Sequence, residues 1–258
     1  MDTLTLWQLA ALAAASTLVG FSKTAVSGAN TISLAVFAAV LPARESTGVL
    51  LPILIAGDLL AVAVYRRHAH WPTLLRLFPA VGVGVVAGTF FMMWADDEAV
   101  RTSIGAILLL MSGVTIRRRR TAAGSGAHAP EEEPAGGPSR AARFKARSYG
   151  ALGGFTTMVA NAGGPVMSLY LLSAGFRKLG FLGTSAWFFL IVNVSKVPFS
   201  VGLGLIDRHS LLLDACLVLF VIPGACVGRR CVDRINQTLF ERIVLGATVL
   251  GGLQLLLR

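Results

Sequence analysis

Long apolar segments separated by short polar ones run along the whole chain of 258 residues. Several of them reach the ~20 residues that an α-helix needs to cross a hydrocarbon core about 30 Å thick. Their apolar residues do not alternate with polar ones, as they would in a membrane β-barrel. The pattern predicts an all-α polytopic membrane protein, with apolar runs at residues 4–21, 29–41, 49–65, 74–94, 100–116, 149–175, 184–205, 211–227 and 239–257.

The composition supports a membrane protein. The chain is 55% hydrophobic and 14% charged, whereas a soluble domain of this size carries more charge on its surface. The net charge of +10 would suggest a nucleic-acid partner in a soluble protein. Here the positive residues lie in short loops, where they indicate topology and lipid contact. We therefore expect the lipid bilayer as a partner and no nucleic acid. The first apolar run lacks a preceding basic residue, which favours a membrane helix over a cleaved signal peptide.

One long segment, residues 117–147, has no apolar face and is rich in proline, glycine, alanine and charge. It predicts a flexible linker between a first membrane half, residues 1–116, and a second half, residues 148–258. Basic clusters at both ends of the linker predict that it is cytoplasmic. The loop charges then predict both termini on the extracytoplasmic side; the basic loops assigned to the cytoplasm are residues 65–70, 176–178 and 228–234.

The two halves resemble each other in sequence. Each half crosses the membrane an odd number of times according to the loop charges, so the copies would have opposite orientations. This predicts two inverted repeats of about five hydrophobic segments each, the plan of many secondary transporters. The matches link residues 20–24 with 154–157, and the spacing of Gly84 and Gly88 with that of Gly224 and Gly228.

A length argument predicts that helices break inside the membrane. Residues 149–175 lie between two loops assigned to the cytoplasm, so this segment must enter and return. As a continuous helix it would measure roughly 40 Å, whereas two full crossings need about 60 Å. We expect broken or re-entrant helices near residues 161–165 and, in the first half, near residues 22–30.

Such breaks suit an anion. A helix that begins at membrane depth points free N–H groups and its positive dipole end into a cavity. Gly163 and Gly164 would let a ligand approach the backbone, and Pro165 suits the first turn of the following helix. A glycine packing face is the alternative, but it does not explain Asn161 and Pro165. The predicted substrate-binding residues are Thr156, Thr157, Asn161, Gly163 and Gly164 in the second half, and Ser22, Lys23, Thr24, Ser27 and Asn30 in the first.

Charged side chains inside the apolar runs form a second set of candidates. Asp58 and Lys196 lie within membrane segments, where an unpaired charge costs several kcal/mol. Asn193 precedes Lys196 by three residues and can share its helix face. Lys196 and Asn193 are predicted to bind substrate, and Asp58 to balance the charge of Lys23 or Lys196 or to carry a coupled proton. Two alternatives to these functional roles remain open. The charged residues could form a structural ion pair, or Lys23 could extend to the membrane interface.

Catalytic and metal-binding motifs are absent from the sequence. The three cysteines lack the spacing of metal ligands, and no catalytic triad, Walker motif or HExxH occurs. We expect no enzyme activity, no metal and no cofactor.

Four stretches together are similar to one known family: "GFSKTAVSGAN", "LLPILIAGDLLAVAVYRRHAHW", "GFTTMVANAGGPVMSLYLL" and "GTSAWFFLIVNVSKVPF". They resemble the sulfite exporter TauE/SafE family. The resemblance implies a permease of the bacterial inner membrane for sulfur-containing anions such as sulfite, thiosulfate or organosulfonates. We therefore expect a secondary transporter that works by alternating access, with proton coupling and the choice of monomer or homodimer left open. The alternatives are an anion channel and a non-transporting membrane assembly or scaffold protein.

Overall fold

The structure is a computed structural model that describes residues 5–25, 30–41, 43–94, 113, 140–206, 208–236 and single positions up to 246. All regular elements in these ranges are helices. They are α1 (Leu6–Thr24), α2 (Asn30–Val40), α3 (Ala43–Tyr65), the short 3-10 helix η2 (Arg66–His68), α4 (Trp71–Trp94), α6 (Arg140–Ala160), α7 (Gly163–Ser173), α8 (Lys178–Gly202) and α9 (Arg208–Arg234).

The helices confirm the predicted all-α polytopic membrane class. Within the described ranges, four are long and apolar enough to cross a membrane: Ser46–His68, Trp71–Trp94, Lys178–Gly202 and Leu211–Arg234. Helix α6 begins at Arg140, so the last residues of the predicted linker are helical. The linker residues before 140 lie outside the described part.

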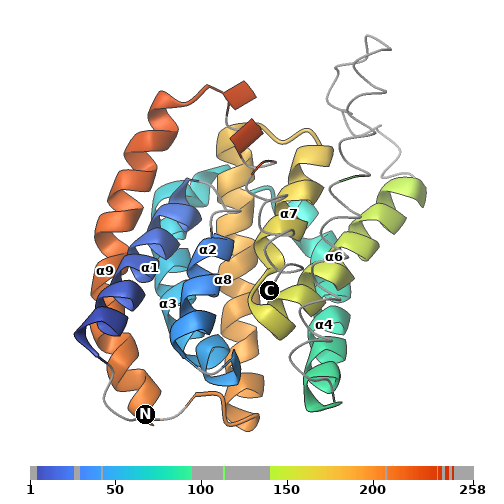
Figure 1. Ribbon diagram of the computed structural model, residues 1–258. Coiled ribbons are helices and arrows are strands. Elements are labelled where there is room, and N and C mark those ends of the chain that lie inside the picture. Colours follow the sequence, from blue (N-terminus) through green and yellow to red (C-terminus); the bar gives the residue numbers. More distant parts are fainter. Residues whose placement is uncertain are drawn as a thin grey trace.

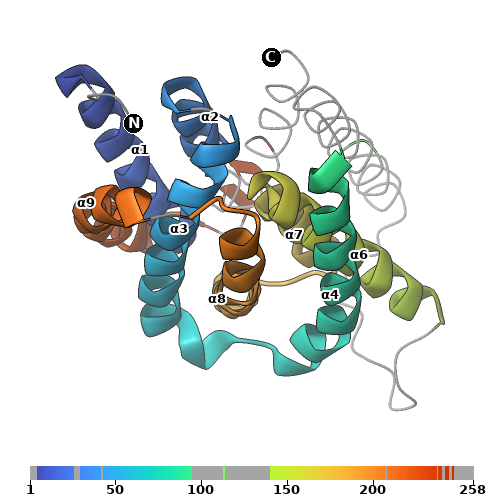
Figure 2. The same cartoon turned by 90° about the horizontal axis from the view of Figure 1, so that it is seen from below.

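The helices form two groups around α8. Figures 1 and 2 show α1, α2, α3 and α9 on one side and α4, α6 and α7 on the other, with α8 packed along α3 between them. Leu12, Leu50 and Val221 belong to the apolar core of the first group. Val81 and Met158 belong to that of the second. The two sequence halves are therefore mixed, because α9 joins the first group and α4 joins the second.

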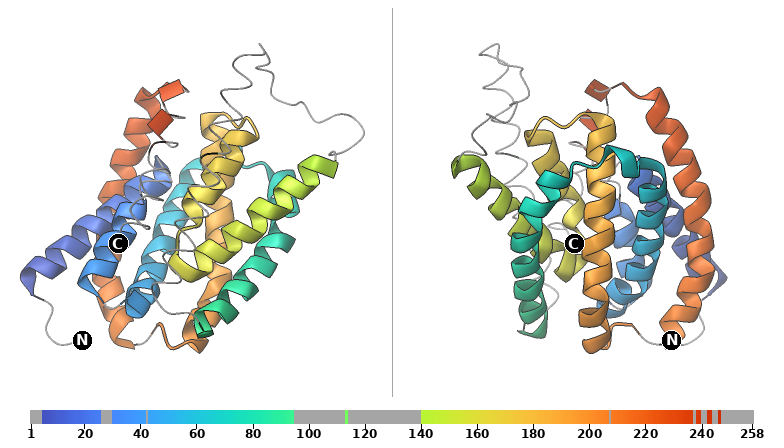
Figure 3. Two further views of the ribbon diagram at one scale, coloured as in Figure 1. Left: turned by 45° about the vertical axis from the view of Figure 1, so that its right-hand side comes forward. Right: turned by 180° about the vertical axis from the view of Figure 1, so that it is seen from behind.

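Close helix contacts join the halves. Helix α1 packs along α9, and α4 packs along α6 (Figure 3). A Cβ added at Gly20 would overlap the carbonyl oxygen of Val221, and one added at Gly84 would overlap that of Ala151. Only glycine permits such an approach between helix backbones.

The two helix pairs make these contacts in the same way. Gly224 of α9 faces the carbonyl oxygen of Thr17, and Gly154 of α6 faces that of Val81. These glycines are among those that the sequence match linked. The reciprocal contacts support a repeat, and the inverted orientation of its copies stays a prediction.

Substitutions on α4 test this packing. We expect Gly84→Ala to lower the stability of the purified protein by about 1–3 kcal/mol, because backbone atoms must move to admit the methyl group. Gly82 is the matched control on the same helix, since a Cβ there has nothing within 4 Å. Gly82→Ala should leave the melting temperature unchanged or raise it, because alanine is the better helix former. Equal melting temperatures for the two variants in detergent would contradict the close contact.

Helix breaks occur at the two predicted places. Helix α1 ends at Thr24 and α2 begins at Asn30, while α6 ends at Ala160 and α7 begins at Gly163. Helices α2 and α7 have 11 residues each, which gives about 16 Å of helix, too short for a full crossing. The breaks therefore place two helix starts within the bundle.

Candidate functional site

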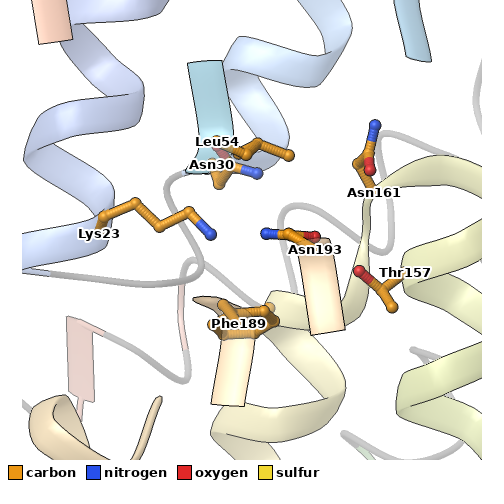
Figure 4. A pocket seen from close by; sticks show the side chains of 8 residues that line it. Lys23, Asn30, Leu54, Thr157, Asn161, Phe189 and Asn193 are labelled. Carbon is orange, nitrogen blue, oxygen red and sulfur yellow. The ribbon is translucent and has the colours of Figure 1, made fainter. Parts of the chain in front are cut away.

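A polar pocket lies between the two breaks, where the helix groups meet. Its cavity volume is about 10 Å³, which is room for about one water molecule, so the pocket is narrow in this conformation. Figure 4 shows the side chain of Lys23 pointing across the pocket toward Asn193, with Thr157 and Asn161 on the opposite side. The pocket is lined by Lys23, Asn30, Leu54, Thr157, Asn161, Gly164, Phe189 and Asn193.

Asn161 forms the turn between α6 and α7. Its φ of 51° is left-handed, and no other non-glycine residue in the described ranges has a positive φ. Asparagine tolerates this conformation better than most residues. Its side-chain Nδ2 donates to the carbonyl oxygen of Thr47 at 3.0 Å, and its Oδ1 accepts from Lys196 Nζ at 2.5 Å. One residue thus fixes the turn and links it to α3 and α8.

Two substitutions separate the roles of Asn161. Asn161→Gly keeps the left-handed turn and removes the side chain, whereas Asn161→Ala also strains the turn by about 1–2 kcal/mol. We expect both variants to lose substrate affinity and the alanine variant to melt at a lower temperature. A glycine variant that melts no higher than the alanine variant would argue against backbone strain at this turn. Ligand binding and melting curves measure the two effects independently.

Lys196 of α8 is buried with 1% exposure and reaches the end of α6. Its Nζ donates to the carbonyl oxygen of Thr157 at 2.6 Å and is 3.4 Å from Asn193 Oδ1. The Thr157 carbonyl oxygen also accepts from the backbone N–H of Asn161 at 3.1 Å, and carbonyl groups in the last turn of a helix carry partial negative charge. Lys196 therefore caps α6 while its charge stays next to the pocket.

Lys23 and Asp58 form a buried ion pair on the other side of the pocket. Lys23 Nζ lies 2.7 Å from Asp58 Oδ1, and the two side chains are 8% and 0% exposed. Asn193 Nδ2 donates to Asp58 Oδ2 at 2.7 Å. The ammonium group of Lys23 also lies over the ring of Phe189, 4.4 Å from its centroid, where a cation–π attraction operates.

Asn193 joins these contacts into one charge network, made up of Lys23, Asp58, Asn193, Lys196 and Asn161. The network contains two cationic side chains and one carboxylate, so it carries an excess of one positive charge when all three are ionised. An uncompensated charge away from water is costly. An anion in the pocket would offset that cost.

The other predicted site residues that the structure describes are not part of the pocket lining. The hydroxyl of Thr24 donates to the carbonyl oxygens of Gly20 at 3.0 Å and Ala225 at 3.1 Å, and that of Thr156 donates to Leu152 at 2.8 Å. Ser22 is buried in α1, and Ser27 lies outside the described residues. Gly163 packs closely on Thr157, because a Cβ there would lie 2.8 Å from the Thr157 Cβ.

Sequence reasoning missed two residues that line the pocket. Leu54 precedes Asp58 by four residues, and Phe189 precedes Asn193 by four. Residues at this spacing share a helix face. Reading one turn back from each polar candidate would have found both.

The described residues offer no group of three or more His, Cys, Asp or Glu side chains that could hold a metal ion. The free cysteines Cys216, Cys226 and Cys231 lie on α9, and none of them lines the pocket.

The chain was compared with known protein families, curated proteins and solved structures. No curated protein and no solved structure matches it. A family model described as "Sulfite exporter TauE/SafE" matches residues 12–255 and so includes every residue of the charge network. This confirms the resemblance seen in the four sequence stretches. The chain therefore belongs to the sulfite exporter TauE/SafE family, whose members are membrane transporters of sulfur anions.

Proposed function

We propose that the protein is a secondary transporter of small sulfur oxyanions or sulfonates, with sulfite as the first candidate, and that the polar pocket is its substrate site. The observation that carries this proposal is the excess positive charge of the buried network beside the pocket. A site for a neutral or cationic solute would not place two lysines against one carboxylate. The family indicates that the substrate contains sulfur, and the pocket would widen from the volume described here to admit one small anion.

The substrate oxygens would accept hydrogen bonds from both halves of the chain. Gly164 lines the pocket in the first turn of α7, where backbone N–H groups have no intrahelical partner. Asn30 lines it at the start of α2, and its buried Oδ1 has no hydrogen-bond partner. Turning that amide would present its NH₂ group to an anion, and Lys23 can turn from Asp58 toward the same ligand.

Alternating access would arise at the boundary on which the pocket lies. The pairs α1–α9 and α4–α6 are each held by close backbone contacts, so each pair would move as a unit. A shift of these pairs against α3 and α8, which carry Leu54, Phe189 and Asn193 of the pocket lining, would open the pocket first to one side and then to the other. The family suggests the bacterial inner membrane as the location. From the loop charges we propose that the linker is cytoplasmic and that both termini are outside.

Counterflow in proteoliposomes tests the function. Vesicles loaded with unlabelled sulfite should take up labelled sulfite against its gradient, because a carrier exchanges one molecule for another. Thiosulfate and sulfoacetate would be tested alongside, with phosphate as the anion that lacks sulfur. The absence of saturable flux for every sulfur anion, with folded protein, would refute the proposal. Ionic currents without counterflow would instead support the anion channel.

A further inference from the structure

Asp214 is a buried carboxyl group that the charge network does not include. It lies in α9, three residues after the start of the span Leu211–Arg234, and is 2% exposed. Neither of its side-chain oxygens has a hydrogen-bond partner, and it takes part in no ion pair found among the described side chains. A buried carboxyl group without a partner needs an explanation, since such groups are rare in folded proteins.

Packing does not explain Asp214. The face of α9 that packs on α1 carries Leu217 and Val221, and the corresponding face of α4 carries Leu77 and Val81 with the same spacing. Three residues before Leu77 stands Leu74, which is 0% exposed. The equivalent place on α9 holds Asp214. The matching helix of the other half fills this position with an ordinary apolar side chain, so the fold does not require an acid there.

No described cationic side chain pairs with Asp214. Of the charged side chains described on α1 and α3, the helices packed on α9, Lys23 and Asp58 pair with each other. The hydroxyl of Tyr65 donates to the carbonyl oxygen of Thr24. Burying a lone carboxylate costs several kcal/mol, and taking up a proton removes most of that cost. Five further charged or titratable side chains lie outside the described part. Asp207, Arg208 and His209 are close to Asp214 in sequence, and Arg44 and Glu45 are at the start of α3.

Asp214 is also separate from the polar pocket. Thr24, next to Lys23, contacts Ala225 on α9, and Ala225 lies eleven residues beyond Asp214. Eleven residues of helix correspond to about 16 Å. A proton on Asp214 therefore does not compete with the substrate for the same atoms.

We propose that Asp214 is the proton-binding residue that couples substrate movement to a proton gradient. The proton binds one carboxylate oxygen in the conformation described here and leaves when a shift of α9 against α3 admits water. Helix α3 carries Asp58 and Leu54, so such a shift also alters the pocket. Asp58 is less suited to this role because Lys23 and Asn193 occupy its two oxygens. This inference rests on the proposed transport of a small anion.

The experiment compares two assays on the wild type, Asp214→Asn and Asp233→Asn. Asp233 is the matched control, an exposed carboxylate on the same helix. Counterflow at equal pH requires exchange of substrate only, whereas accumulation driven by a pH gradient requires coupling. We expect Asp214→Asn to retain counterflow and to lose accumulation, while Asp233→Asn retains both. If Asp214→Asn does not fold, Asp214→Leu replaces it, since leucine fills the equivalent position on α4.

Two results would overturn the proposal: accumulation by Asp214→Asn under a pH gradient, or accumulation by the wild type under a sodium gradient alone. A wild type that transports no sulfur anion would refute the proposed function instead. In that case infrared spectroscopy decides the state of Asp214. The band of a protonated carboxyl group should be present at neutral pH in the wild type and absent in Asp214→Asn, and its absence from the wild type would contradict a bound proton.

Discussion

Replacing Lys196 with methionine is expected to weaken sulfite binding by about 10- to 100-fold. The substitution removes the positive excess of the charge network. It leaves Asn161 Oδ1 without the Lys196 donor and leaves the Thr157 carbonyl oxygen with only the backbone N–H of Asn161. A hydrogen bond to a charged group contributes about 1.5–3 kcal/mol, and each 1.4 kcal/mol corresponds to about a tenfold change in affinity. Binding is measured by the rise in melting temperature at increasing sulfite concentration, since a ligand stabilises the folded state by mass action.

Lys178 provides the matched control for Lys196. It lies on the same helix, and its Nζ donates to the carbonyl oxygens of Val232 at 2.7 Å and Ile235 at 2.8 Å, at the end of α9. Both lysines therefore bind backbone carbonyls at a helix end, but only Lys196 contacts residues that line the pocket. Lys178→Met should lower the melting temperature and leave sulfite binding intact. Equal loss of binding in both variants would show that Lys196 acts through helix stability rather than through its charge.

Replacing Asp58 with asparagine is expected to cost about 3–5 kcal/mol of stability, because it leaves the ammonium group of Lys23 buried without a counter-charge. For a chain of this size that corresponds to a fall in melting temperature of roughly 10 °C. Asn193 can still donate to an oxygen at position 58, so the effect comes chiefly from the lost ion pair. Thermal unfolding in detergent, followed by intrinsic fluorescence, measures the fall.

A double variant tests whether the unpaired Lys23 charge causes this loss of stability. The double variant Lys23→Met with Asp58→Asn removes both charges and leaves no unpaired ion, so it should recover most of the stability lost in Asp58→Asn. Substrate transport should not recover, because Lys23 lines the pocket. If the two substitutions instead lower the melting temperature additively, the ion pair is not the source of the stability.

The helix breaks could be predicted from the sequence because the residues that form them are rarely found together within a continuous helix. Asn161, Gly163 and Pro165 disfavour a continuous helix, and the loop charges required a return within too short a length. The hydrogen-bond partners of Thr24 and Thr156 could not be predicted from the sequence. The hydroxyl of a helical threonine can donate to the backbone carbonyl oxygen one turn earlier or to a ligand. Tertiary packing decided this choice: both hydroxyls bind backbone carbonyls.

For the charged residues too, one part of the result could be predicted from the sequence and another part depended on tertiary packing. That Lys23, Asp58 and Lys196 would interact could be inferred from the cost of isolated charges in a membrane. Which lysine pairs with Asp58 depends on how α1 and α8 approach α3, and sequence spacing within one helix does not contain that information. Asp214 was not among the candidates predicted from the sequence, although it lies in the apolar run 211–227. Only its burial without a hydrogen-bond partner sets it apart from an acid at a helix end.

The exchange of helices between the halves has a consequence for the synthesis of the protein. Helix α1 leaves the ribosome before the other described helices, whereas α9, the helix against which its glycine face packs, is made after all of them. Until α9 is inserted, the face of α1 around Gly20 and Thr17 contacts lipid or another helix. The first half alone therefore lacks the partner of its own first helix. The packing of α1 is complete only after α9 has entered the bilayer. This part of the fold therefore assembles through contacts that are distant in sequence, which is typical of slow folding.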